Sequence, residues 1–158
     1  MTSFHVPLFN RRFLNQRALA QPTPPEHKKR LCDWADAIRG GALRKQKESE
    51  VRGPFIQRFF VEILGYRPFS GEPEWTITNE KRTGSGSADA ALGHFNDDAK
   101  TVVAPVELKG ADTPDLDAIM PGRYKSPVQQ VWEYAMDTPG CQFLLVSNML
   151  EFRLYAVG

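Results

Sequence analysis

The sequence has 158 residues, of which 41% are hydrophobic and 25% are charged, and this suits one globular domain that buries its own core. It contains no run near the roughly 20 apolar residues of a membrane span, and its N-terminus lacks the apolar segment of a secretion signal. Cys32 and Cys141 lack metal-site spacing, so we expect reduced packing residues in a cytoplasmic protein. Lys and Arg number 20 against 19 Asp and Glu, so the net charge excludes no class of partner.

The basic residues are concentrated in the N-terminal third of the chain. Residues 1–50 hold ten Lys or Arg against five Asp or Glu, whereas residues 51–158 hold ten against fourteen. This distribution fits a surface that faces nucleic acid beside an acidic, metal-binding pocket. A solvated helical face explains the same charges equally well.

Residues 1–44 are expected to form a basic, helical extension that packs on the core. A short strand is predicted near residues 5–9, and the prolines of residues 21–25 break the chain because proline fixes φ and lacks an amide donor. Apolar residues then recur at helical spacing from Leu31 to Ile38, and the glycines at 40 and 41 end this helix.

Residues 45–158 are expected to form the main domain, which opens with a second helix. Its apolar stripe runs from Val51 to Ile63 and stops at Gly65. Pro54 interferes with a regular helix, so the helix either begins near Gly53 or is kinked there.

The rest of the chain reads as strands around one more helix. Ser126 followed by a proline is a typical helix start, and the uninterrupted apolar run at 143–146 is typical of a strand covered on both faces. The order predicts an α/β fold with a mixed central β-sheet flanked by helices. We expect strands at 74–78, 88–95 and 101–109, a loop at 111–125, a helix at 126–136, and strands at 143–146 and 151–157.

The predicted strand at 101–109 ends in two charged side chains. Successive side chains of a strand alternate between its faces, so Glu107 and Lys109 lie side by side. Asp89 stands on the preceding predicted strand, and pairing of the two strands as a hairpin would bring both carboxylates and Lys109 together. Two carboxylates with a backbone carbonyl and waters suit Mg²⁺ or Mn²⁺. Taken alone, the Glu-x-Lys tripeptide is more typical of an amphipathic strand that ends at the surface than of a metal site.

The ordered set of motifs resembles a known nuclease superfamily. Asp89 followed by Glu107, Leu108 and Lys109 resembles the D…(D/E)xK signature of the PD-(D/E)XK nucleases, with Ala88 in place of the usual proline. The Q-x-x-x-Y spacing at 130–134 resembles the RecB-like branch. Residues 45–158 as a whole are similar to the N-terminal nuclease domains of restriction–modification enzymes that fuse cleavage to an adenine methyltransferase. The resemblance implies a restriction-endonuclease-like core and a chain that is a fragment of a longer polypeptide.

The resemblance implies a metal-binding and catalytic set. Asp89, Glu107 and the backbone carbonyl of Leu108 would bind Mg²⁺ or Mn²⁺, and Lys109 would orient or activate the attacking water. Glu50, at the start of the first core helix, would bind a second metal, with Glu48 as its rival for this role.

Further positions are implied on the helix and at the glycine-rich turn. Gln130 would place the nucleophile or a nearby backbone group, and Tyr134 would contact phosphate or brace the site. Lys81 and Arg82 would contact the DNA backbone. As alternatives, Asp89 is a hairpin residue, Gln130 and Tyr134 are an ordinary half-buried helix pair, and the two basic residues are solvated loop charges.

The function implied by the resemblance is Mg²⁺-dependent DNA cleavage in the cytoplasm. The partners would be DNA and, in the same longer polypeptide, methyltransferase and target-recognition domains, without a membrane. Two alternatives stay open: a nuclease-fold module that binds nucleic acid without cleaving it, and a metal-dependent nuclease that acts on RNA or on DNA ends.

Overall fold

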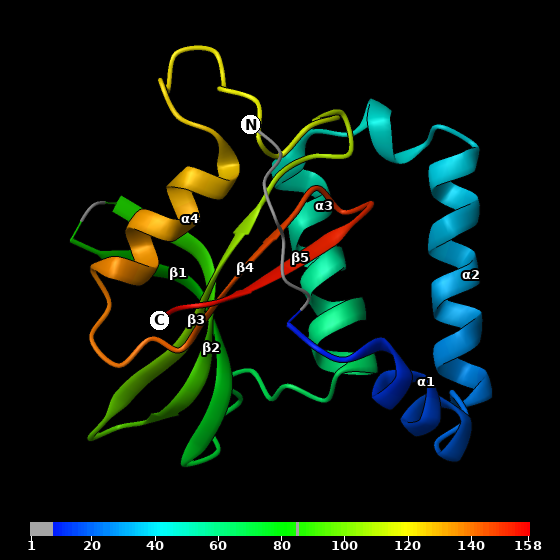
Figure 1. Cartoon of the computed structure of the whole chain (residues 1–158), viewed down its shortest axis with the longest axis horizontal. Coiled ribbons are helices and arrows are strands. Elements are labelled where there is room, and N and C mark those ends of the chain that lie inside the picture. The colour runs from blue at the N-terminus through cyan, green and yellow to red at the C-terminus, as the bar shows by residue number, and fades with distance from the viewer. Residues whose placement is uncertain (1–7, 85) are drawn as a thin grey trace.

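A five-stranded mixed sheet lies between helices, in the strand order β1-β2-β3-β4-β5 (Figure 1). The computed structural model describes residues 8–84 and 86–158, and all their side chains except that of Thr83. Strands β3 and β4 are parallel, and the other neighbours are antiparallel. The expected α/β class with a flanked mixed sheet is therefore confirmed. The strands are β1 (Glu74–Thr83), β2 (Gly86–Asn96), β3 (Lys100–Leu108), β4 (Phe143–Ser147) and β5 (Phe152–Ala156).

Helices lie on both sides of this sheet, with α4 on one side and α2 and α3 on the other (Figure 1). The helix α3 continues without a break into a π-helical segment, η2, whose backbone follows an i to i+5 pattern such as Leu64 N–H to Phe59 carbonyl at 3.0 Å. The helical elements are α1 (Arg11–Ala20), α2 (Pro25–Arg39), the 3₁₀ turn η1 (Leu43–Lys45), α3 (Glu48–Phe55), η2 (Ile56–Ile63) and α4 (Pro127–Met136).

Two apolar clusters cover the opposite faces of the sheet. Leu145 of β4 packs with the α3 and η2 cluster, whereas its neighbours Leu144 and Val146 pack with α4. Alternation along a strand gives this arrangement directly, and it confirms the expected strand covered on both faces. Trp34 ties α2 to the first cluster, since its indole N–H donates to the Met149 carbonyl at 3.0 Å.

The N-terminal half differs from the sequence expectations in several places. The helix at 48–63 does not begin near Gly53. It runs through Pro54, which lacks an amide donor, and changes to the π pattern two residues later at Ile56. The helix α1 was not predicted, and it has no buried residue. Of the strand predicted near 5–9, residues 5–7 lie outside the described residues, and residues 8 and 9 form a bend instead.

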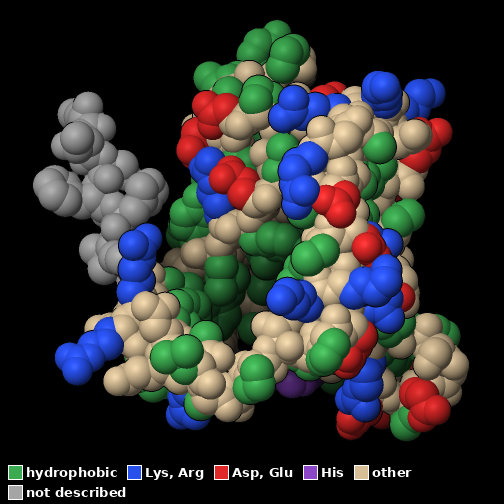
Figure 2. Space-filling view, turned by 90° about the vertical axis from the view of Figure 1, so that its right-hand side faces the viewer, with side chains coloured by type: hydrophobic (Ala, Val, Ile, Leu, Met, Phe, Trp, Pro, Cys, Tyr) green, Lys and Arg blue, Asp and Glu red, His purple; other side chains and the backbone are tan. Residues whose placement is uncertain are grey.

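Three basic residues of α2, Lys29, Arg30 and Arg39, are paired with acids. Lys29 binds Asp33 at 2.7 Å, and Arg30 binds Glu62 at 2.7 Å. Figure 2 shows Lys and Arg side chains interspersed with Asp and Glu on this side of the molecule, around a hollow with hydrophobic walls. These pairs favour the solvated helical face over a purely basic surface.

Two smaller expectations concern the cysteines and the membrane. Both cysteines are free thiols; Cys141 is partly buried, whereas Cys32 is exposed, so its expected packing role is wrong. Within residues 8–84 and 86–158, the helices are too short or too polar for a bilayer span.

Gly93 sits where the pairing of β2 and β3 shifts by one residue, and this position generates a stability prediction. A Cβ at Gly93 would lie 2.0 Å from the Thr101 carbonyl oxygen, so Gly93→Ala has to displace backbone of the central ladder. We expect a loss of about 3 kcal/mol in the free energy of unfolding, measured by urea titration.

Gly53→Ala is the matched control, because nothing lies within 4 Å of a Cβ at that helical position. It should stabilise the protein by about 0.5–1 kcal/mol. Equal stabilities for the two variants would contradict the described β2–β3 register.

Candidate active site

The backbone pairing of β2 and β3 stops at the pair Ala90 and Val106. Beyond this pair, the side chain of Asp89 accepts the next hydrogen bond from β3. Leu108 donates its backbone N–H to Asp89 Oδ2 at 2.8 Å. The N–H and C=O of one strand residue point to the same side of the strand, so the Leu108 carbonyl also faces Asp89. The hairpin expected from the sequence is confirmed, and it brings Asp89 to the end of β3.

Glu107 and Lys109 form a buried ion pair at this end of β3. Their exposed fractions are 1% and 4%, and Lys109 Nζ contacts Glu107 Oε1. The backbone N–H of Lys109 donates to the Ser147 carbonyl at 2.8 Å, which holds the residue against β4. Glu107 Oε2 is buried and has no hydrogen-bond partner among the described residues. One oxygen of Glu107 is thus paired, and the other, which we call the open oxygen, is buried without a partner among the described residues.

Burial raises the pKa values of both carboxyl groups. The pKa of Glu107 rises from 4.5 to about 7, first because burial disfavours the anion and second because Asp89 is near, while Lys109 opposes the shift. Burial also raises the pKa of Asp89, against the opposing effects of the Leu108 N–H and Arg52. A cation bound beside these two carboxyl groups would therefore stabilise their charged forms and lower their pKa values.

Arg52 and Glu48 extend the cluster from α3, one helical turn apart. Arg52 Nη1 lies 2.9 Å from Asp89 Oδ1, and its Nη2 lies 2.7 Å from Glu48 Oε1. Glu48 Oε2 accepts the backbone N–H of Gly110 at 3.3 Å, directly after Lys109. Sequence reasoning missed Arg52, although its i, i+4 spacing from Glu48 is a signal for an ion pair on one helical face.

Glu50 does not join this cluster, and Glu48 takes the place expected for it. Glu50 is exposed, and its carboxylate accepts the backbone N–H of Lys47 at 3.0 Å to cap α3. Two residues along an α-helix are about 200° apart, so Glu48 and Glu50 face different ways. The helix begins earlier than the sequence indicated, and this decides which glutamate faces the sheet.

Gln130 and Tyr134 lie together on α4, on the side of the carboxylates. Gln130 Nε2 donates to the Tyr134 hydroxyl at 2.5 Å, and Arg123 Nη1 donates to Gln130 Oε1 at 3.3 Å. Burial raises the pKa of Tyr134, the Gln130 hydrogen bond opposes it, and Glu107 adds to the rise. The pair is buried beside the charged cluster, and its internal hydrogen bond also suits an ordinary helix pair.

Lys81 and Arg82 flank the same end of the sheet on β1. The register pairs Lys81 with Ala88 and Arg82 with Ser87, next to the position of Asp89. Arg82 is exposed and Lys81 is partly exposed, so both can meet a ligand that approaches this end of the sheet.

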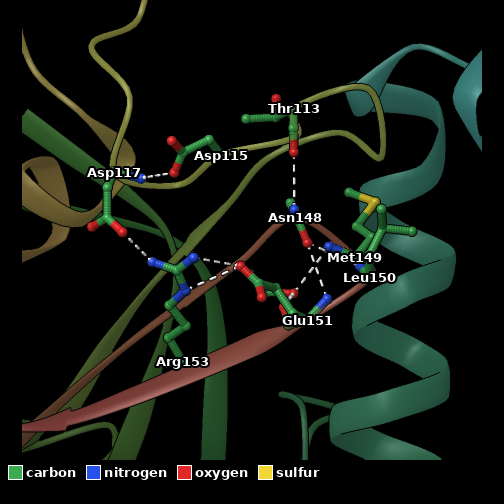
Figure 3. Close-up of polar contacts among 9 residues, drawn as sticks. Thr113, Asp115, Asp117, Asn148, Met149, Leu150, Glu151 and Arg153 are labelled. Carbon is green, nitrogen blue, oxygen red and sulfur yellow. Dashed lines mark hydrogen bonds and ion pairs between the residues drawn. The ribbon is translucent and has the colours of Figure 1, made fainter. Parts of the chain in front are cut away.

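The loop that leaves the site is tied to the turn between β4 and β5 (Figure 3). Asn148 Nδ2 donates to the Thr113 carbonyl at 2.9 Å, and its Oδ1 accepts the Glu151 N–H at 3.0 Å. Arg153 bridges the same two segments, since it contacts Asp117 at 2.6 Å and Glu151 at 2.8 Å. These bonds hold the segment between Lys109 and α4 in place.

The oxygen atoms of this site could hold a hard divalent cation that needs few protein ligands. Within the described parts of the chain, three or more His, Cys, Asp or Glu side chains are nowhere grouped to hold a metal ion. Mg²⁺ commonly needs only one or two carboxylates and keeps several waters. Asp89, the open oxygen of Glu107 and the Leu108 carbonyl could supply such a set. A cation would give the buried open oxygen the partner that it lacks among the described residues.

Comparisons with models of protein families, with curated proteins and with solved structures gave no match. The site combines a buried carboxylate, Glu107, and a partly buried one, Asp89, on adjoining strands, with a lysine beside them and an arginine from the facing helix.

The raised pKa of Glu107 predicts a stability that falls as the pH rises in EDTA. A carboxyl group whose pKa is higher in the folded than in the unfolded protein stabilises the folded state. For Glu107 this stabilisation is complete below the unfolded-state pKa of 4.5 and is lost as the pH rises through the folded-state pKa of about 7. Relative to Glu107→Gln, we expect the wild-type free energy of unfolding to drop by about 2–3 kcal/mol between pH 5 and pH 8. Urea unfolding at several pH values measures it, and a constant difference would contradict the raised pKa.

Proposed function

We propose that this chain is a Mg²⁺-dependent DNA endonuclease domain with a restriction-endonuclease-like core. The observation that carries the proposal is that two carboxylates, the buried Glu107 and the partly buried Asp89, lie on adjoining strands at the same end of the sheet. Lys109 contacts Glu107, and one oxygen of Glu107 has no partner among the described residues. Buried carboxylates with raised pKa values and a specific charged partner are typical of functional sites.

The proposed chemistry is hydrolysis of a phosphodiester bond. A bound Mg²⁺ supplies neutralisation of phosphate charge and a lowered pKa of a bound water. Asp89, Glu107 and the Leu108 carbonyl would hold this ion, and Lys109 would orient the water and stabilise negative charge that develops on the phosphate. Gln130, which is bonded to Tyr134 and Arg123, would help to place the attacking water or a nearby backbone group.

The proposed partner is DNA, whose phosphates would meet Lys81 and Arg82 at the β1–β2 hairpin. The sequence resemblance further suggests a cytoplasmic restriction–modification protein with methyltransferase and target-recognition domains in the same polypeptide. Recognition of a target sequence would then belong to those domains.

A non-catalytic nucleic-acid-binding module is the second candidate, and one observation favours it. Arg52 pairs with Asp89 and Lys109 pairs with Glu107, so each carboxylate has a protein cation in the absence of metal. Such pairing can make a buried acidic pair purely structural. Binding of a divalent cation separates the two candidates, because a structural network offers it no net gain.

Supercoiled-plasmid nicking in Mg²⁺ or Mn²⁺, against EDTA, tests the proposed activity. Asp89→Asn and Glu107→Gln should each lower the nicking rate by at least about a hundredfold, together with Mn²⁺ affinity measured by calorimetry. Lys109→Met should lower the nicking rate by about a hundredfold with less effect on Mn²⁺ affinity, because lysine acts on the water and the phosphate.

Asp97→Asn is the matched control, since Asp97 is an exposed acid at the other end of the β2–β3 hairpin. Wild-type protein that neither nicks DNA nor binds Mn²⁺ in an Asp89-dependent way would refute the nuclease proposal and favour the binding module. Duplex DNA, DNA ends and RNA as parallel substrates decide between the endonuclease and the alternative nucleases.

A second prediction compares the two glutamates of α3. Glu48→Gln should lower nicking by about tenfold or more, because Glu48 contacts both Arg52 and the backbone after Lys109. Glu50→Gln should change stability by less than about 0.5 kcal/mol and leave nicking little changed, because the glutamine oxygen still accepts the Lys47 N–H at the helix cap. The reverse order of nicking rates would show that Glu50 serves the site after all.

A further inference from the structure

Arg52 occupies the position of a cation at the carboxylates. Its two terminal nitrogens contact Asp89 at 2.9 Å and Glu48 at 2.7 Å, so one guanidinium bridges two acids from different elements. The Arg52 Nε is buried and has no partner among the described residues, so the third donor of the guanidinium is unsatisfied in this position. The two ion pairs with Asp89 and Glu48 thus hold Arg52 in place, although its Nε–H has no hydrogen-bond partner among the described residues.

Both oxygens of Asp89 are engaged in this arrangement. Oδ2 accepts the N–H of Leu108, and Oδ1 faces Arg52. A divalent cation at Asp89 would stand beside the positive guanidinium, and like charges in a part-buried site repel strongly. Metal and Arg52 therefore compete for the same carboxylate.

We infer that Arg52 is a resident counter-ion of the proposed metal site, which holds Asp89 in place without metal and has to release it when a divalent cation binds. The inference rests on the proposed function, since it concerns the same site. Arg52 is a positioning residue in this scheme: it keeps two partly buried acids, Asp89 and Glu48, compatible with a folded, metal-free protein, and it lowers metal affinity as a consequence.

The structure gives the guanidinium room to turn away. A hollow of about 370 Å³ lies directly beside it, lined by Ser49, Arg52, Ile56, Asn79, Glu80 and Asp89. The side chain of Arg52 is 27% exposed, so it already borders solvent on this side. Release of Asp89 therefore needs movement of one side chain only, and the apolar cluster under α3 can stay unchanged.

Calorimetric titration with Mn²⁺ tests the inference without reference to activity. Arg52→Gln should bind Mn²⁺ at least about tenfold more tightly than the wild type. A positive neighbour lowers the affinity of a carboxylate for a proton by about tenfold or more, and we expect a similar effect on its affinity for a metal cation. The double variant with Asp89→Asn should lose this gain. A merely structural arginine predicts the opposite sign, because Asp89 would lose its support and bind metal more weakly.

Arg58→Gln is the matched control, since Arg58 lies on the same helical segment, stacks over Trp34 and does not touch the cluster. Its Mn²⁺ affinity should stay within about twofold of the wild type, as for a screened and distant charge. Arg52→Met keeps the aliphatic stem and replaces Arg52→Gln if that variant fails to fold in a thermal melt.

The outcomes separate the two proposals. Wild-type binding with equal or weaker binding by the Arg52 variants overturns the counter-ion inference and leaves the metal site standing. Tighter binding by the variants, dependent on Asp89, supports it even if the wild type binds too weakly to measure. Failure of every variant to bind Mn²⁺ overturns both proposals.

Discussion

The buried ion pair of Glu107 and Lys109 is the constraint on which the site depends. Transfer of two charges from water costs several kcal/mol per ion, and their attraction offsets this only where the geometry and further hydrogen bonds are good. Both groups stand on a strand end whose apolar neighbours Val106 and Leu108 are fully buried. Water is largely excluded there, so the protein itself has to supply partners, and one oxygen of Glu107 has none in the described residues. That open oxygen makes the position costly as a purely structural feature.

Asp89 meets a backbone need and an electrostatic one at the same time. Where β2 and β3 cease to pair, its carboxylate accepts the amide of Leu108, which would otherwise lose its ladder partner. Its second oxygen draws Arg52 from α3 and, through Arg52, Glu48. The sheet end and the facing helix are thus joined by charge as well as by the apolar cluster that contains Val51, Ala90 and Leu108. Such a network is the kind of local cost that proteins carry at functional sites.

Several features of the chain followed from its sequence, and the reasons differ between elements. Period-2 alternation and apolar runs located all five strands, and the Ser126-Pro127 pair located α4, whose cap has Ser126 bonded to Gln129. The helix α1 was missed because it has no core-facing stripe, as the lack of any buried residue in it shows. The sequence favoured Glu50 over Glu48, whereas the structure brings Glu48 next to the end of β3. Which of the two faces the sheet depends on the first residue of α3, and helix boundaries are the weakest signal in a sequence.

Three features could be read from the sequence alone: the order of the elements, the position of two carboxylates and a lysine on consecutive strands, and the chemistry that such groups offer a divalent cation. These are properties of local spacing, since a strand alternates and a hairpin brings its neighbours together. The three-dimensional contacts were needed to show that Glu107 is buried with one oxygen unpaired among the described residues, that Arg52 contacts Asp89, and that Glu48 rather than Glu50 lies beside the end of β3. Burial and contacts between α3 and the sheet join residues about 40 to 60 positions apart, and no local pattern encodes which of them meet.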